Sequence, residues 1–163
     1  MNRTDESAAA GTSTEPEFSL QSVYLKDCSF EAPKGPRIEE TWNPQISLDL
    51  NTAVDVVSPE VREVVLTVSV TARNGTTSAV AFLAEVKQAG LFGVRNVSED
   101  DYRRAVAIIA PNVLFPYARA VVSQLVSLGG FPQMLLPPVN FDALYARSIA
   151  EAQAESQAKV LKN

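Results

Sequence analysis

The chain has 163 residues, a formal net charge of −5, 46% hydrophobic residues and 20% charged residues. These values predict one folded globular domain without a basic surface for nucleic acid. The sequence contains no histidine, one cysteine and neither common glycine-rich phosphate motif. Histidine-based catalysis, histidine metal sites, an internal disulfide and the usual phosphate cradles are therefore excluded. We expect a protein that is not an enzyme and that binds no cofactor and no metal.

Three segments are predicted along the chain. Residues 1–17 are small and polar and lack an apolar core, which indicates a disordered tail rather than a secretory signal. Residues 18–149 form the expected domain, and residues 150–163 form a polar C-terminal tail that we expect to fray. No apolar run has the length of a membrane span, and the single thiol suits a reducing compartment, so we expect a cytoplasmic protein.

The first predicted strand covers residues 18–30. Its apolar residues occupy even positions from Phe18, switch to odd positions at Val23 and return to even positions at Cys28. Two such switches indicate bulges or bends in the strand. Prolines and a glycine in residues 31–44 then predict a crossing loop rather than a tight hairpin. Trp42 in this loop either anchors it to the core or lines a binding surface.

Three further strands are predicted. Residues 45–57 and 61–73 alternate apolar and polar side chains, as half-buried strands do. Asn74-Gly75 predicts a type I′ hairpin turn, because glycine and asparagine tolerate positive φ. In the returning strand, residues 77–90, the face of Leu83 is less polar than solvent requires. That face is either loosely patterned and exposed, or it contacts another chain.

Three helical segments are predicted after the strands: a short one, and then two longer ones. Ser98 caps a helical stretch that we expect to break at Pro111, and the next helix runs from there to Gly129, which we expect to adopt a left-handed cap. This central helix is apolar on two sides. Its main predicted stripe consists of Leu114, Tyr117, Val121, Leu125 and Leu128, and a second stripe consists of Val113, Val122 and Val126. One side can pack on a sheet, whereas the other is covered by a second subunit, is covered by a loop, or stays exposed.

The segment after the central helix, residues 131–139, is too apolar for a plain connector. Pro137-Pro138 stiffens it, so it packs flat on the core or walls a groove. Asn140 is placed as the N-cap of the last helix. Strands followed by helices predict an α+β fold: a four-stranded antiparallel meander with helices packed on one face. Its long edges and the two-sided helix favour an oligomer in which sheets extend or stack.

The chain resembles the SecB-type protein-export chaperones. The motifs that carry the resemblance are YLKDCSFEAP (24–33), WNP with LDL (42–50), FLAEVKQAGLF (82–92), PNVLFPYAR (111–119) and GFPQMLLPPVNFDALY (130–145). They span most of the chain in order, which makes the set specific although no single motif is a catalytic fingerprint.

This resemblance implies a dimer of dimers that holds precursor proteins unfolded without nucleotide and delivers them to the SecA motor. The family's hydrophobic groove for extended clients would be walled by residues 33–44 and 129–139. The groove candidates are Phe30, Trp42, Phe131, Met134 and Leu136. For each of them, ordinary core packing is the alternative.

The resemblance also assigns contacts to partners. Positions matching the family's motor-protein contact are Asp27, Glu31, Leu83 and Glu85. Positions matched to oligomer integrity, together with the second face of the central helix, are Ala84, Val86, Gln88, Tyr117, Val121 and Leu125. Two other functions remain open on the residues: a SecB-like chaperone dedicated to one partner such as an antitoxin, and a small-ligand-binding α+β module.

Overall fold

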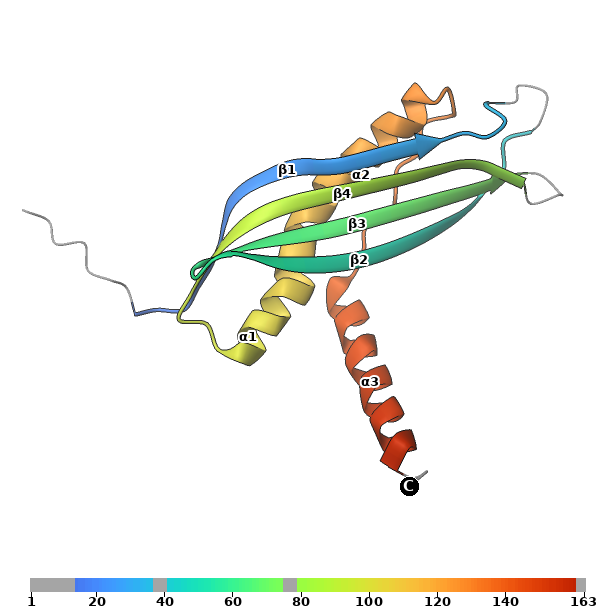
Figure 1. The fold of residues 1–163 in the computed structure, drawn as a ribbon. Coiled ribbons are helices and arrows are strands. Elements are labelled where there is room, and N and C mark those ends of the chain that lie inside the picture. The colour runs from blue at the N-terminus through green and yellow to red at the C-terminus, as the bar shows by residue number, and fades with distance from the viewer. Residues whose placement is uncertain (1–13, 37–40, 75–78, 161–163) are drawn as a thin grey trace, which may run out of the picture.

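Four long antiparallel strands form one sheet, and helices lie on one of its faces (Figure 1). The structure, a computed structural model, describes residues 14–36, 41–74 and 79–160. Most of the predicted N-terminal tail and Gly75 of the predicted turn lie outside these residues. The elements are β1 (Glu17–Glu31), β2 (Gln45–Ser58), β3 (Val61–Asn74), β4 (Ala79–Arg95), α1 (Glu99–Arg104), the π-helical turn η1 (Ala105–Ile109), α2 (Ala110–Leu128) and α3 (Phe141–Val160).

The strand order is β1-β4-β3-β2, so only β2, β3 and β4 form a meander. The prediction of a meander through all four strands was wrong at β1, which pairs with β4 instead of β2. The predicted crossing loop explains the difference. Neighbouring strands lie about 4.8 Å apart, and the connection from Glu31 to Gln45 is long enough to cross the sheet to its other edge.

The two predicted irregularities of β1 are confirmed. The register with β4 shifts between Leu20 and Ser22 and again between Leu25 and Asp27. Each shift adds a residue to β1 that has no partner on β4, which bends an edge strand and changes which side chains share a face. The second shift places Lys26 as the extra residue, and this matters for the outer face described below.

The core lies between the inner face of the sheet and α2. Alternate residues of β3 and β4 are fully buried there, among them Leu66, Val68, Phe82 and Val86. Gly90 allows a close approach, because a Cβ atom at this position would lie 3.0 Å from Cδ2 of Leu114 on α2. The helix therefore packs directly on the centre of the sheet.

The side of α2 that faces the sheet differs from the predicted stripe. Leu114, Ala118, Val122 and Val126 recur every four residues and are fully buried. Of the main predicted stripe only Leu114 belongs to this buried side, whereas Val122 and Val126 belong to the second predicted stripe. Both sides are apolar, so periodicity alone could not decide which of them the sheet would cover.

Pro111 does not break the helical stretch. The π-helical turn η1 joins α1 to α2, so that α1, η1 and α2 are continuous. A proline ring clashes with the carbonyl one turn before it, and a wider π-helical turn is one way to accommodate such a residue. The predicted cap at Ser98 is confirmed, because its Oγ accepts a hydrogen bond from the backbone N–H of Asp101 at 3.2 Å.

The C-terminus of α2 uses Gly130, not Gly129, as its left-handed residue. Gly130 has φ of +80°, whereas Gly129 has an ordinary φ of −70°. The N–H of Gly130 donates to the carbonyl of Ser127, and the N–H of Phe131 donates to that of Val126. This is a Schellman motif, which satisfies the last carbonyls of the helix and turns the chain back onto the core.

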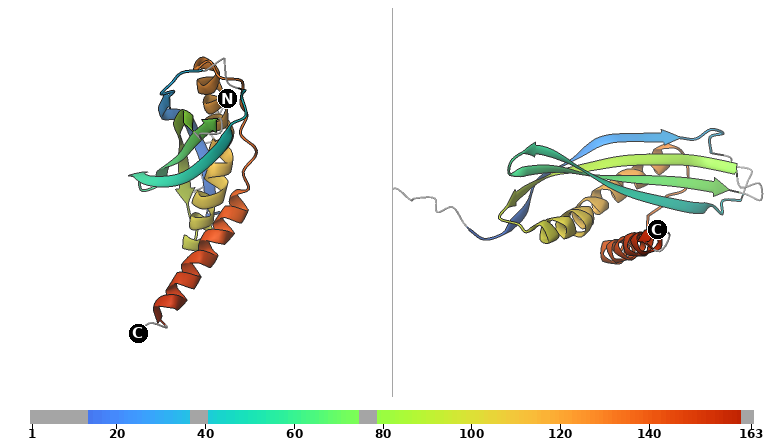
Figure 2. Two further views of the ribbon diagram at one scale, coloured as in Figure 1. Left: turned by 90° about the vertical axis from the view of Figure 1, so that its right-hand side faces the viewer. Right: turned by 60° about the horizontal axis from the view of Figure 1, so that its bottom comes forward.

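The last helix, α3, points away from the sheet (Figures 1 and 2). Asn140 caps it as predicted, since its Oδ1 accepts a hydrogen bond from the N–H of Ala143 at 2.9 Å. Phe141 is buried and packs edge-on against Phe115 of α2 at 5.9 Å between ring centroids. The helix continues to Val160, beyond the point where the sequence predicted fraying.

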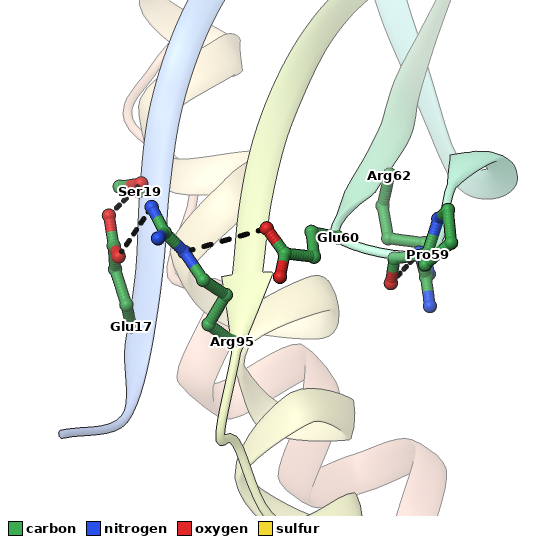
Figure 3. Close-up of polar contacts among 6 residues, drawn as sticks. All are labelled: Glu17, Ser19, Pro59, Glu60, Arg62 and Arg95. Carbon is green, nitrogen blue, oxygen red and sulfur yellow. Dashed lines mark hydrogen bonds and ion pairs between the residues drawn. The ribbon is translucent and has the colours of Figure 1, made fainter. Parts of the chain in front are cut away.

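An ion network ties three segments at one end of the sheet (Figure 3). Arg95 at the end of β4 lies 3.2 Å from the carboxylate of Glu17 and 3.9 Å from that of Glu60. Arg62 closes the β2–β3 turn by donating to the carbonyl of Ser58 at 2.7 Å. These contacts join the start of β1 to the β2–β3 turn.

The expectation that no apolar stretch has the length of a membrane span was wrong. The helical stretch Glu99–Leu128 has 30 residues and is apolar enough to cross a membrane by length and composition. Within the fold, 44% of its most apolar window is buried. Because Leu114 and Val122 pack on the sheet, we interpret this stretch as a core helix of the domain.

Candidate functional site

Three predicted groove residues meet in one aromatic cluster at the end of the sheet where α2 finishes. Phe30 on β1, Trp42 in the crossing loop and Phe131 after α2 surround Phe82 of β4. The ring centroids of Trp42 and Phe131 are 5.4 Å apart, and those of Phe30 and Phe131 are 6.2 Å apart. Residues far apart in the sequence thus form one aromatic cluster.

The groove candidates divide into buried and accessible residues. Phe131 and Leu136 are 7% and 2% exposed, so both belong to the core of the single chain. Phe30, Trp42 and Met134 are only partly buried and pack against that core. The structure therefore favours core packing for Phe131 and Leu136, and leaves the other three candidates within reach of a ligand.

Leu135, in the segment after α2, is a further exposed apolar residue that the groove candidates did not include. It lies between Met134 and Leu136 and is 62% exposed. The segment after α2 has no regular secondary structure, so its run of apolar residues carries no period that would tell inward from outward positions. Only the path of the chain shows that Leu136 points inward and Leu135 outward.

The predicted motor-contact residues gather on the outer face of the sheet. Within the described part of the chain, the helices lie on the opposite face (Figure 2). Glu31 pairs with Leu83 across the β1–β4 ladder, and Asp27 and Glu85 lie further along the same face. Leu83 is 39% exposed, and the carboxylates of Asp27 and Glu85 are accessible. We call Asp27, Glu31, Leu83 and Glu85 the motor-contact surface.

A second polar group on the outer face spans three strands. The hydroxyl of Tyr24 and the ammonium of Lys26, both on β1, hydrogen-bond to the two carboxylate oxygens of Glu63 on β3. Tyr24 and Lys26 are two residues apart in β1 and therefore share a face. The bulge at Lys26 brings the next residue, Asp27, to this face as well. Ala89 on β4, the register partner of Tyr24, lies on the strand between β1 and β3 and is fully buried. We call Tyr24, Lys26 and Glu63 the outer-face triad.

The triad shifts two pKa values. The hydrogen bond to Glu63, with smaller effects of burial and of the charge on Glu63, raises the pKa of Tyr24 to about 12. The hydrogen bonds from Lys26 and Tyr24 lower the pKa of Glu63 below its ordinary value. Both shifts favour the state in which Tyr24 is neutral and Glu63 is ionised.

The predicted oligomer residues fall into two groups. Tyr117 on α2 is 50% exposed, and Val121 and Leu125 beside it are partly buried, so this apolar flank of α2 is open in the single chain. By contrast, Ala84, Val86 and Gln88 are 3%, 0% and 3% exposed beneath α2. Ala84, Val86 and Gln88 thus support α2 from the sheet, and their side chains are not accessible to a second chain.

Among the described residues, no three His, Cys, Asp or Glu side chains are placed to hold a metal ion. The thiol of Cys28 on β1 is exposed. The candidate site thus consists of three surfaces: an aromatic cluster with accessible rims, an open apolar flank on α2 and an acidic outer face.

The fold resembles that of a SecB-like chaperone from Mycobacterium tuberculosis, solved in complex with a ChAD peptide from an antitoxin. The TM-score is 0.64 at 18% sequence identity, over 76% of this chain and 91% of that one. At this identity the likeness shows the shared fold alone.

Relatives found by sequence are more similar to this chain than that structure is. Protein-export protein SecB of Pseudomonas paraeruginosa is 50% identical over 155 residues, which cover 93% of this chain and 94% of that protein. Protein-export protein SecB of Pseudomonas putida is 44% identical over 99% of this chain and its own full length. The family model described as preprotein translocase subunit SecB matches residues 11–152. This chain belongs to the SecB family.

Proposed function

We propose that this protein is an ATP-independent chaperone that holds precursor proteins unfolded in the cytoplasm and delivers them to the SecA motor for export. The observation that carries the proposal is family membership at 50% identity over nearly the whole chain. The accessible rims of the aromatic cluster and the open flank of α2 support it, because large exposed apolar surfaces mark sites for other proteins.

The aromatic cluster is the proposed client site. Trp42 is partly buried beside Phe82 and Phe131, and the segment after α2 adds the partly buried Met134 and the exposed Leu135. Each client side chain buried there contributes about 1.5–3 kcal/mol, and ordering of the client opposes this gain. A few such anchors give weak and reversible holding, which several sites of one oligomer would strengthen through effective concentration. Holding of this kind needs no nucleotide.

The proposed assembly is a dimer of dimers. Tyr117, Val121 and Leu125 form an apolar flank on α2 that one chain leaves open. Among the described residues, no further strand pairs with either long edge of the sheet, β1 or β2. Edges and apolar helix flanks are the surfaces through which such domains associate.

The experiment measures refolding of a chemically unfolded precursor, without nucleotide, in the presence of the wild-type protein or a double variant, Trp42→Ala with Leu135→Ser. The wild type should slow refolding, and the variant should slow it less, because two accessible contacts are lost. Leu136→Ala is the matched control, since Leu136 is 2% exposed in the same segment. It should lower thermal stability while leaving the slowing intact below its melting temperature.

Two results would contradict the proposal. One is a wild-type protein that affects no unfolded precursor, and the other is an effect that requires ATP. If Leu136→Ala reduced holding as strongly as the double variant at a temperature where both are folded, the assignment of the rim residues would be wrong. Many precursors in a pull-down, and not one dominant protein, should distinguish an export chaperone from one dedicated to a single partner.

A further inference from the structure

Lys87 lies within the motor-contact surface and is shared between two of its acids. Its Nζ is 3.7 Å from Oδ2 of Asp27 and 3.6 Å from Oε1 of Glu85. In the sheet, Lys87 on β4 is the register partner of Asp27 on β1, and Glu85 lies two residues earlier on the same strand. Side chains two apart in a strand share a face, so the ammonium group is held between both carboxylates.

Both ion pairs of Lys87 are exposed and exchangeable. The side chains of Lys87, Asp27 and Glu85 are 41%, 59% and 43% exposed, and both N–O distances are long for an ion pair. Exposed pairs of this kind contribute little to folding stability. Glu85 also accepts a hydrogen bond from Oγ of Ser69 on β3 at 3.1 Å, so its carboxylate stays in place when the ammonium moves.

The other lysine on this part of the face is committed elsewhere. Lys26 precedes Asp27 in the sequence, but its ammonium is bonded to Glu63, whose side chain is only 12% exposed. The charge of Lys26 is therefore matched by an acid outside the motor-contact surface. Lys87 instead offsets the charges of the surface itself.

We propose that Lys87 lowers the affinity of the motor-contact surface for a cationic partner, by offsetting part of the negative charge of Asp27 and Glu85 in the free chaperone. An Arg or Lys of the partner that approaches either acid must displace the ammonium of Lys87 or dock beside it. Like charges at contact distance repel, and displacement breaks two ion pairs. Lys87 thus weakens docking and speeds release. This inference rests on the proposed function, which supplies the partner, the SecA motor.

The test compares binding of purified SecA to the full-length wild type, Lys87→Gln, Lys87→Arg and Arg103→Gln by titration calorimetry at low and high salt. Lys87→Gln should bind SecA about three- to tenfold more tightly at low salt, and the gain should shrink at high salt because screening weakens the interactions of exposed charges. Lys87→Arg should bind like the wild type, since it keeps the charge. Arg103→Gln is the matched control, because Arg103 is also an exposed cation paired with an acid, Glu99, but lies on α1.

Arg103→Gln makes the same change in net charge and should leave SecA binding unchanged. Weaker or unaltered binding of Lys87→Gln would overturn the role of Lys87, and so would an equal gain in Arg103→Gln. Slowing of precursor refolding is measured on the same four proteins and should be equal in all of them. Failure of the wild type to bind SecA and to slow refolding would instead contradict the proposed function, so the two failures are distinguishable.

Discussion

The hydroxyl of Tyr24 on β1 donates a hydrogen bond to the carboxylate of Glu63 on β3, across the strand that separates them. Lys26 binds the second oxygen of the same carboxylate. An edge strand is normally held by one ladder alone, and here the outer-face triad adds a side-chain connection to the next strand but one. The same connection holds the chain immediately before Asp27 of the motor-contact surface.

Removing the shared carboxylate should loosen β1. We expect Glu63→Ala to lower the free energy of unfolding by about 1–2 kcal/mol, because two hydrogen bonds that involve charged groups are lost. Glu60→Ala is the control: Glu60 also pairs with a basic residue of the sheet, Arg95, but at 3.9 Å and with 67% of its side chain exposed. It should cost less than about 0.5 kcal/mol. Urea denaturation measures both, and equal losses would contradict the role of the triad.

Acid should remove the contribution of Glu63. Its pKa is lowered in the folded protein, so the stability it provides is fully present above the ordinary value of 4.5 and is lost as pH falls through the lowered value. The difference in unfolding free energy between the wild type and Glu63→Gln should therefore be constant near neutral pH and shrink below pH 4.5. A difference that grows on acidification would show that the carboxylate is not stabilised by folding.

Alkali should act on Tyr24 in the opposite sense. Its folded pKa of about 12 lies above the ordinary 10.0, so its contribution is fully present below pH 10.0 and is lost as pH rises toward about 12. The wild type should lose stability over this window relative to Tyr24→Phe, which has no ionisable group there. The other tyrosines are common to both proteins, so the difference isolates Tyr24. A constant difference across the window would refute the hydrogen bond to Glu63.

Close packing of α2 on the sheet should make Gly90 intolerant of a methyl group. A Cβ at Gly90 would lie 2.8 Å from the ring of Phe92 and 3.0 Å from Leu114. Both neighbours are fixed in the core, so we expect Gly90→Ala to cost about 1–3 kcal/mol. Gly93→Ala is the control, because its closest neighbours are the ends of the Gln21 and Ser19 side chains, which can move. Thermal unfolding should separate the two variants, and equal melting temperatures would count against this packing.

The open flank of α2 should be needed for assembly. We expect the wild type to have a mass near four times 17.6 kDa and Tyr117→Lys to have a smaller one, because a charge would be buried between chains. Asn112→Lys is the control, since Asn112 is an exposed polar residue on another side of the same helix. It should leave the mass unchanged. Native mass measurement decides the question, and a wild-type monomer would contradict the proposed dimer of dimers.

The pattern of neighbouring residues determined much of the secondary structure of this protein. The alternation of apolar residues predicted the four strands to within a few residues, and the parity changes at Val23 and Cys28 predicted the two bulges of β1. Ser98 and Asn140 marked helix starts through the hydrogen bonds that their side chains accept. These features depend on neighbours in the sequence, so the sequence suffices for them. The SecB motifs, read in order, indicated the family.

Long-range partners required the tertiary structure. Alternation shows that β1 has two faces but not that it pairs with β4, and periodicity shows that α2 has two apolar sides but not that Val122 is covered while Tyr117 is open. Likewise, nothing local links Tyr24 to Glu63, or makes Leu136 core and Leu135 surface. Each of these choices depends on which distant segment occupies the space beside the residue, and only the folded chain specifies that.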